Sequence, residues 1–218
     1  MARPTKRHVN KVLSRLQKHY PAAECALDYS TPEQLLIATI LSAQCTDKRV
    51  NLVTAPLFKK YPTPFEIALL DITELEKLVK STGFYRNKAK NIKACCVALV
   101  ERHNGKVPQN LEDLVALAGV GRKTANVVLG TAFGIASGVV VDTHVGRIST
   151  RLGLTTKREA ISAEKELMAI LPREEWINYS HRLIHFGRGI CQSRKPDCGH
   201  CFMESFCPKI GLKTSVKS

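Results

Sequence analysis

Four cysteines near the C-terminus have the residue type and the spacing of metal ligands. They lie within 17 residues, with six, two and five residues between them: Cys191, Cys198, Cys201 and Cys207. Both a structural zinc ion and an iron–sulfur cluster take four thiolates. Zinc sites usually join two short pairs across a longer gap, whereas these cysteines form one compact loop. The spacing alone predicts a metal centre and leaves zinc and an iron–sulfur cluster both open.

A tight turn between two predicted helices is the second candidate site. Asn110 can cap the first helix, whose apolar face is predicted to include Val115. The turn itself is Gly119-Val120-Gly121, where glycine permits a positive φ and Val120 is expected to point into the core. The amides of the turn and of the next helix would then face outward and bind phosphate, directly or through a cation. The alternative is an ordinary corner between two helices that binds nothing.

Lys123 and Asp142 each have a chemical and a plainer interpretation. Lys123 falls in the first turn of a helix, where the dipole disfavours a cation and so favours a neutral, nucleophilic amine. Its plainer role is a point-charge contact with phosphate, which the sequence alone favours. Asp142 precedes another helix and can act as its N-cap. A carboxylate there could also stabilise a nearby cation or help to activate the lysine or a water.

Composition indicates the class of partner. The chain has 218 residues, a formal charge of +14 and a sequence pI near 9.6, which favours a polyanion as partner over a merely solvated basic surface. No run approaches the ~18 apolar residues of a membrane span, and the charged N-terminus is not a secretory signal. We therefore expect a cytoplasmic chain with no membrane partner. The remaining cysteines are then expected to be buried thiols: Cys25, Cys45, Cys95 and Cys96.

Helix-start signals recur along the chain and predict an all-α fold of about ten helices. The only β-like run, 139–141, is too short and isolated to make a sheet. The first twenty residues predict a separate helix over 9–20, and 134–138 has the composition of a linker. Caps are predicted at Thr31, Thr63, Asp71 and Thr156.

Three motifs together resemble one family. Residues 117–128, LAGVGRKTANVV, are similar to the helix-hairpin-helix motif of the endonuclease III family of DNA glycosylases. Residues 141–145, VDTHV, match the family's second signature, and the cysteine spacing matches its [4Fe-4S] loop. The similarity runs over almost the whole chain. It implies that Lys123 is the nucleophile, that Asp142 is the second catalytic residue and that the four cysteines hold a structural [4Fe-4S] cluster.

The resemblance also implies an architecture. It predicts two helical domains, with the helix-hairpin-helix in residues 25–135 and the iron–sulfur cluster domain formed by 1–24 plus 136–218. The active site is expected in the cleft between the domains, with Lys123 on one side and Asp142 on the other.

The implied activity is a bifunctional DNA glycosylase and abasic-site lyase of base excision repair. Its partner is double-stranded DNA with damaged bases or abasic sites, its substrates are oxidised pyrimidines such as thymine glycol, and its place is the nucleoid. A flipped base is released as Lys123 attacks C1′, and β-elimination through a Schiff base cuts the strand. We expect a monomer. Two other readings are a monofunctional mismatch glycosylase, whose relatives usually lack a lysine at position 123, and a non-catalytic DNA-binding protein.

Two further loops resemble family loops that enter the DNA. The resemblance implies that Gln44 fills the gap left by the flipped base and that Phe84 wedges between bases. The family residue at the wedge is usually aliphatic, so Phe84 is a departure, and its alternative is a core phenylalanine. His144 either reaches phosphate or sugar or is a structural histidine. The predicted DNA-binding residues are Gln44, Phe84, Gly119, Val120, Gly121, Arg122, Thr124 and His144.

Overall fold

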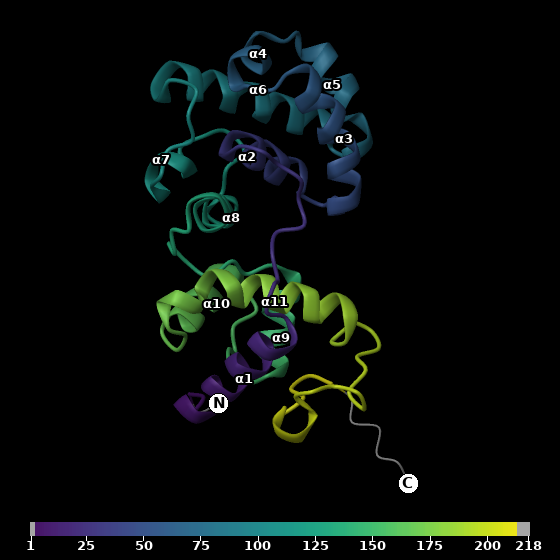
Figure 1. The fold of residues 1–218 in the computed structure, drawn as a ribbon, viewed down its shortest axis with the longest axis vertical. Coiled ribbons are helices and arrows are strands. Elements are labelled where there is room, and N and C mark those ends of the chain that lie inside the picture. Colours follow the sequence, from purple (N-terminus) through teal and green to yellow (C-terminus); the bar gives the residue numbers. More distant parts are fainter. Residues whose placement is uncertain (1–2, 213–218) are drawn as a thin grey trace. The chain divides into compact units, whose positions relative to one another are not determined.

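The computed structural model describes residues 3–212, and all the regular structure in that range is helical (Figure 1). The predicted all-α class is therefore confirmed, and residues 139–141 form no strand. Residues 1–2 and 213–218, which the predicted cluster domain includes, lie outside the described range. Within it, no helix combines the length and the apolar character that crossing a membrane requires.

The chain divides into two compact units, each with its own hydrophobic core. The continuous unit is Cys25–Ser137. The split unit combines Met1–Glu24 with Gly138–Ser218, so that its parts are separated in sequence by the whole continuous unit.

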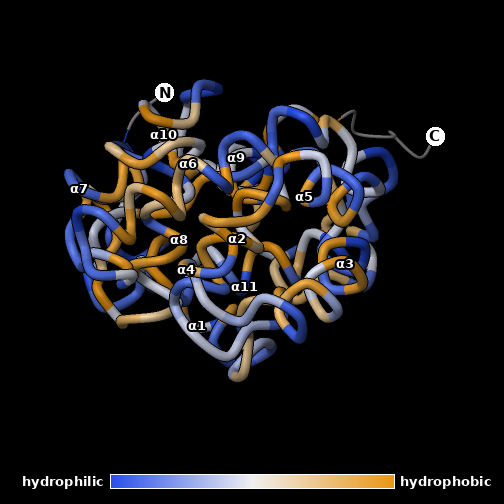
Figure 2. Tube along the Cα trace, turned by 90° about the horizontal axis from the view of Figure 1, so that it is seen from above, coloured by the Kyte–Doolittle hydropathy of each residue, from blue (hydrophilic) through white to orange (hydrophobic). Residues whose placement is uncertain are grey.

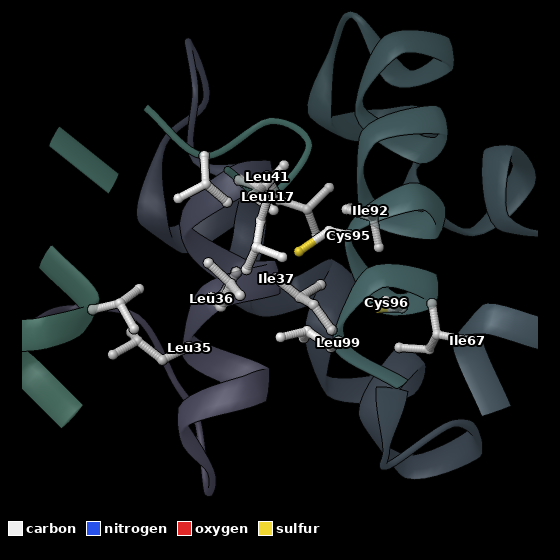
Figure 3. Packing of buried hydrophobic residues seen from close by; sticks show 14 of the residues in the cluster. Leu35, Leu36, Ile37, Leu41, Ile67, Ile92, Cys95, Cys96, Leu99 and Leu117 are labelled. Atoms are coloured by element: carbon white, nitrogen blue, oxygen red, sulfur yellow. The ribbon is translucent and has the colours of Figure 1, made fainter. Parts of the chain in front are cut away.

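The continuous unit is built around α2. Most of this helix is drawn in hydrophobic colours in Figure 2, and all residues from Glu33 to Leu41 are buried. A helix that is apolar on all sides must be covered on all sides, and α2 contacts α3, α6 and α8. Figure 3 shows Ile37 and Leu41 of α2 beside Cys95 of α6. The elements are α2 (Pro32–Leu41), α3 (Asp47–Lys60), α4 (Pro64–Leu69), α5 (Ile72–Val79), η1 (Lys80–Thr82), α6 (Tyr85–His103), α7 (Leu111–Val115) and α8 (Arg122–Phe133).

The split unit packs α11 against α9 and α1. Tyr179 of α11 is fully buried, and its hydroxyl lies 2.7 Å from the Ser149 hydroxyl of α9. The elements are α1 (Lys6–His19), α9 (Thr143–Arg151), α10 (Ala160–Met168), η2 (Arg173–Glu175), α11 (Trp176–Gly189) and η3 (Glu204–Phe206).

Most of the predicted helix starts are confirmed. Thr31 and Asp71 accept backbone N–H groups of Gln34 and Thr73, at 3.3 and 2.8 Å. At Thr63 the capping box is present, and its own amide donates to the Glu66 carboxylate at 2.8 Å. These starts could be predicted because a capping side chain and the amides that donate to it are close in sequence.

Two predicted helix starts are wrong. The first helix begins at Lys6 rather than at residue 9, because the Thr5 hydroxyl caps it by accepting the His8 amide at 3.2 Å. Thr156 caps no helix, because α10 begins only at Ala160 and the Thr156 amide donates to Glu166 within that helix at 3.1 Å. Glu159 caps α10 in its place.

Candidate functional site

The hairpin between α7 and α8 has the expected backbone. Asn110 accepts the Asp113 amide at 2.9 Å and caps α7, and Val120 is 5% exposed within the core of the continuous unit. Gly119 has φ +75°, and a Cβ there would lie 2.8 Å from Cβ of Asn91. Val115 differs from its prediction, since it is 42% exposed. The turn is therefore fixed by Val120 and Gly119.

Gly121 is a different kind of glycine. Its φ of −84° is open to any residue, and a Cβ there would meet nothing within 4 Å. The packing of this unit therefore does not require glycine at this position. The first bond of α8 runs from the Ala125 amide to the Gly121 carbonyl at 3.0 Å. The amides of Lys123 and Thr124 precede it and have no acceptor inside the helix.

Lys123 projects from this helix start into solvent, since its side chain is exposed. The first turn of α8 has no acidic residue, so nothing there offsets the positive end of the helix dipole. The hairpin thus combines outward amides and a lysine amine at one point. Such a point suits an anion, and its amine is accessible to a reacting carbon.

Asp142 is the N-cap of α9. Its Oδ1 accepts the Val145 amide at 2.8 Å, and the residue is half-buried. His144 Nδ1 lies 3.2 Å from Nη2 of Arg147 on the same helix, which is the protein contact that the structural interpretation of His144 expects. The capping role of Asp142 leaves its charge in place, so the carboxylate can serve the fold and a reaction together.

Gln44 and Phe84 lie on two exposed turns of the continuous unit. Gln44 follows the end of α2 with φ +53°, and Phe84 is the N-cap residue directly before α6, with φ +46°. Phe84 is 67% exposed, so the core-phenylalanine interpretation is wrong. A left-handed backbone is unusual for a side chain as large as phenylalanine, and such strained residues are concentrated at functional sites.

The four cysteines of the C-terminal loop line one hollow in the split unit. All four are half-buried free thiols, and Arg151 Nη1 donates to Cys191 Sγ at 3.3 Å. Burial raises the pKa of Cys201 and Cys207, and the other thiols of the loop raise it further. Among the described residues, no three potential ligands converge on a single metal ion.

The other four cysteines divide into two pairs. Cys95 and Cys96 are fully buried as predicted, and burial raises the pKa of Cys95 to about 12. Cys25 and Cys45 are only half-buried, which differs from the prediction. Cys25 lies in the segment between α1 and α2, and Cys45 lies in the turn between α2 and α3.

Three cationic side chains are buried among the described residues, and sequence reasoning missed two that contact the candidate site loops. Arg151 is 7% exposed and donates to the carbonyls of Gln192 and Ser193, at 2.7 and 2.8 Å, so it holds the start of the cysteine loop. Lys88 is buried at the start of α6. Each occupies the apolar face of its helix, in line with Ile148 and Ile92 respectively. A basic residue at a helix position whose neighbours at helical spacing are apolar is the sequence signal that could have indicated Arg151 and Lys88.

Residues 37–173 match the family model "HhH-GPD superfamily base excision DNA repair protein". The chain is 54% identical over 203 residues to endonuclease III of Synechocystis sp., with 93% of each chain covered. It is 42% identical to endonuclease III of Escherichia coli K12, with 90% of this chain and 93% of that one covered.

Solved structures agree with these relatives. A trapped covalent intermediate of an endonuclease III with DNA has a TM-score of 0.89 and 45% identity, covering 94% of this chain and 97% of that one. A thermostable thymine-DNA glycosylase has a TM-score of 0.83 at 22% identity, which is a likeness of fold alone. The chain therefore belongs to the HhH-GPD superfamily of base excision DNA repair proteins and, within it, to the endonuclease III family.

Proposed function

We propose that the chain is a bifunctional DNA glycosylase and abasic-site lyase that removes oxidised pyrimidines, such as thymine glycol, from double-stranded DNA. The observation that carries the proposal is Lys123, an exposed amine in the first turn of α8, directly after the hairpin. Relatives at 42% to 54% identity are endonucleases III, and one similar solved structure is a covalent intermediate with DNA. A monofunctional mismatch glycosylase would not need the lysine.

The proposed reaction follows from a free amine beside a flipped nucleotide. The Lys123 nitrogen attacks C1′, the bond from C1′ to the base breaks, and the base leaves with a proton. The sugar ring opens to a protonated Schiff base. Loss of a proton from C2′ then expels the 3′ phosphate and nicks the strand. Water finally hydrolyses the Schiff base, which breaks the bond from C1′ to nitrogen and frees Lys123. Asp142 stabilises the positive charge that develops on the sugar and helps to take the proton from the lysine.

DNA contact in this proposal begins at the phosphates. The hairpin from Gly119 to Gly121, with the amides and side chains of Arg122 and Thr124, binds a backbone phosphate, and the open space at Gly121 supports a close approach of the DNA there. Exposed Arg194 and Lys195 add charge from the cysteine loop. Gln44 fills the gap in the duplex, Phe84 wedges between bases, and His144 assists near the phosphate or sugar.

The four cysteines fit a [4Fe-4S] cluster. They line one hollow, and burial without a metal raises the pKa of two of them, which metal ligation would offset. Cys191, Cys198, Cys201 and Cys207 would hold the cluster. When bound, it supplies four iron–sulfur bonds that fix the loop. The chain itself contributes Arg151, which donates to Cys191 Sγ at 3.3 Å and to two carbonyls of the loop.

In this proposal the two units provide different functional groups. Residues 25–135 provide the helix-hairpin-helix and Lys123, and residues 1–24 with 136–218 provide Asp142 and the cluster loop. Both units must therefore act on the same nucleotide. Because DNA is the substrate, we place the protein at the nucleoid in the cytoplasm.

The test is a borohydride trap. Protein is mixed with duplex DNA carrying one thymine glycol, or one abasic site, and reduced so that a Schiff base becomes a stable adduct. We expect an adduct with the parent and none with Lys123→Ala. The control is Lys90→Ala, another exposed lysine of the continuous unit. An adduct that persists in Lys123→Ala would remove the lysine assignment, and no adduct with the parent would favour the monofunctional glycosylase.

A further inference from the structure

Lys88 is a buried cation that the proposed chemistry does not use. It is 5% exposed, and burial lowers its pKa. Lysine is almost never buried to this degree without a partner, because removing the charge from water is costly. Its position therefore has to be explained by what its ammonium group contacts.

The ammonium group joins two segments that are far apart in sequence. Lys88 Nζ donates to the Leu41 carbonyl at 2.8 Å and to the Thr82 carbonyl at 2.8 Å. Leu41 is the last residue of α2, and Thr82 is the last residue of η1. Carbonyls at the end of a helix lack intrahelical donors, and a cation is favoured at the negative end of the helix dipole.

The two carbonyls lie directly before the two turns with left-handed residues. Gln44 is three residues after Leu41, and Phe84 is two residues after Thr82. The backbone of Lys88 takes part as well, since its amide donates to the Phe84 carbonyl at 3.1 Å. One residue thus holds both sides of the Phe84 turn and the base of the Gln44 turn.

We propose that Lys88 is a positioning residue for base flipping, which fixes the Gln44 turn and the Phe84 turn to one point so that both side chains enter the DNA together. The inference rests on the proposed function, in which Gln44 fills the gap and Phe84 wedges the stack. Both turns have strained backbones at exposed residues, so they need a rigid support to remain in place without DNA. Two hydrogen bonds from a buried cation provide that support at low local dielectric.

The test compares Lys88→Met with Lys90→Met. Methionine keeps most of the buried volume and removes the charge and the donors, whereas Lys90 is exposed on the same helix and controls for loss of charge. The substrate is a duplex with thymine glycol opposite 2-aminopurine, whose fluorescence rises when it loses stacking. Fluorescence and base release are followed in single turnover at saturating protein, below the Tm of each variant.

We expect Lys88→Met to slow both the fluorescence rise and base release by roughly 10- to 100-fold, the effect of losing hydrogen bonds to a charged group. Cleavage of a single-stranded abasic site, which requires no flipping, should change less than about twofold. Lys90→Met should match the parent in all three assays, and Lys88→Arg should recover part of the rate. Should Lys88→Met fail to fold, Lys88→Gln takes its place, because it removes the charge and shortens the reach.

A merely structural role would give other results. If Lys88→Met slowed single-stranded cleavage as much as base release, the positioning role would be overturned. A second comparison uses the Gln44→Ala, Phe84→Ala double variant, in which the two supported side chains are already absent. If Lys88→Met slowed base release by the same factor in this double variant as in the parent, the positioning role would also be overturned, because residues that act through one step are not additive. Lys123→Ala separates the two proposals. It should lose the trapped adduct and keep the fluorescence rise, so an adduct in that variant counts against the proposed function alone.

Discussion

The hairpin and the cysteine loop hold their functional groups in opposite ways. The hairpin from α7 to α8 is fixed by its own chain, through buried Val120 and the close approach of Gly119 to Asn91. The loop from Cys191 to Cys207 has one short 3-10 helix, and its four thiols line a hollow. The hairpin is thus fixed by packing within the chain, whereas the cysteine loop has little regular structure and, in our proposal, depends on a bound cluster.

The largest effect should come from the loop. Cys198→Ala removes one of four ligands, so we expect loss of bound iron, loss of the visible absorption of the cluster and a Tm lower by on the order of 10 °C. Cys25→Ala, a half-buried cysteine of the continuous unit, is the control and should retain the cluster. Iron analysis and thermal melting provide the measurements. Full iron content in Cys198→Ala would exclude it as a ligand.

Substitution of Asp142 tests whether a side chain that caps a helix can also take part in catalysis. Asparagine caps helices as well as aspartate does, so Asp142→Asn should change stability by less than about 0.5 kcal/mol, whereas Asp142→Ala should lose about 1 kcal/mol. Both should slow release of thymine glycol by roughly 100-fold or more in single turnover. Parent activity in Asp142→Asn would leave the residue only its capping role.

The two glycines of the hairpin are expected to affect different properties, Gly119 the stability of the fold and Gly121 the binding of DNA. Gly119→Ala forces a Cβ into Asn91 at a positive φ and should cost about 1 to 3 kcal/mol of unfolding free energy. Gly121→Ala has open space and an ordinary φ, so its stability should remain within about 0.5 kcal/mol. If a DNA phosphate approaches Gly121, the affinity of Gly121→Ala for duplex DNA should fall about tenfold. Denaturant melts and DNA titrations would measure the two effects, and parent affinity in Gly121→Ala would place the phosphate elsewhere.

The smallest effect should be a change in salt dependence. Arg194→Ala and Lys195→Ala alter exposed residues of the cysteine loop, so the fold and cluster should be unaffected. Each should lower the slope of log affinity against log salt by about 1 if the side chain contacts a phosphate. Titrations at several salt concentrations would show this. An unchanged slope would mean that the loop has no electrostatic role in binding.

Much of the fold could be predicted because its signals are local. The caps at Thr31, Asp71 and Asn110 bind amides two or three residues away, and the hairpin needs only glycine and one apolar residue in sequence. The endonuclease III resemblance is confirmed by the comparisons. The roles of Lys123 and Asp142 remain predictions.

What could not be predicted depends on distant partners. Thr156 is of a residue type that often caps helices, but α10 begins only at Ala160, and the Thr156 amide donates to the Glu166 carboxylate of that helix. In the sequence, Lys88 cannot be distinguished from the neighbouring exposed basic residues, because the carbonyls to which it donates belong to α2 and η1. The exposure of Phe84 likewise follows from packing around its turn rather than from its type.

The divided sequence of the split unit has a consequence for synthesis on the ribosome. α1 buries Val9, Val12 and Leu16 in the core that it shares with α9 and α11, and it is made before any of that core exists. Residues 25–137 intervene, which at ordinary translation rates delays its partners by on the order of 10 s. The nascent chain can complete its contiguous domain during this interval, while an amphipathic helix remains exposed to chaperones. The cysteine loop, with η3, is the last of the described elements to be synthesised.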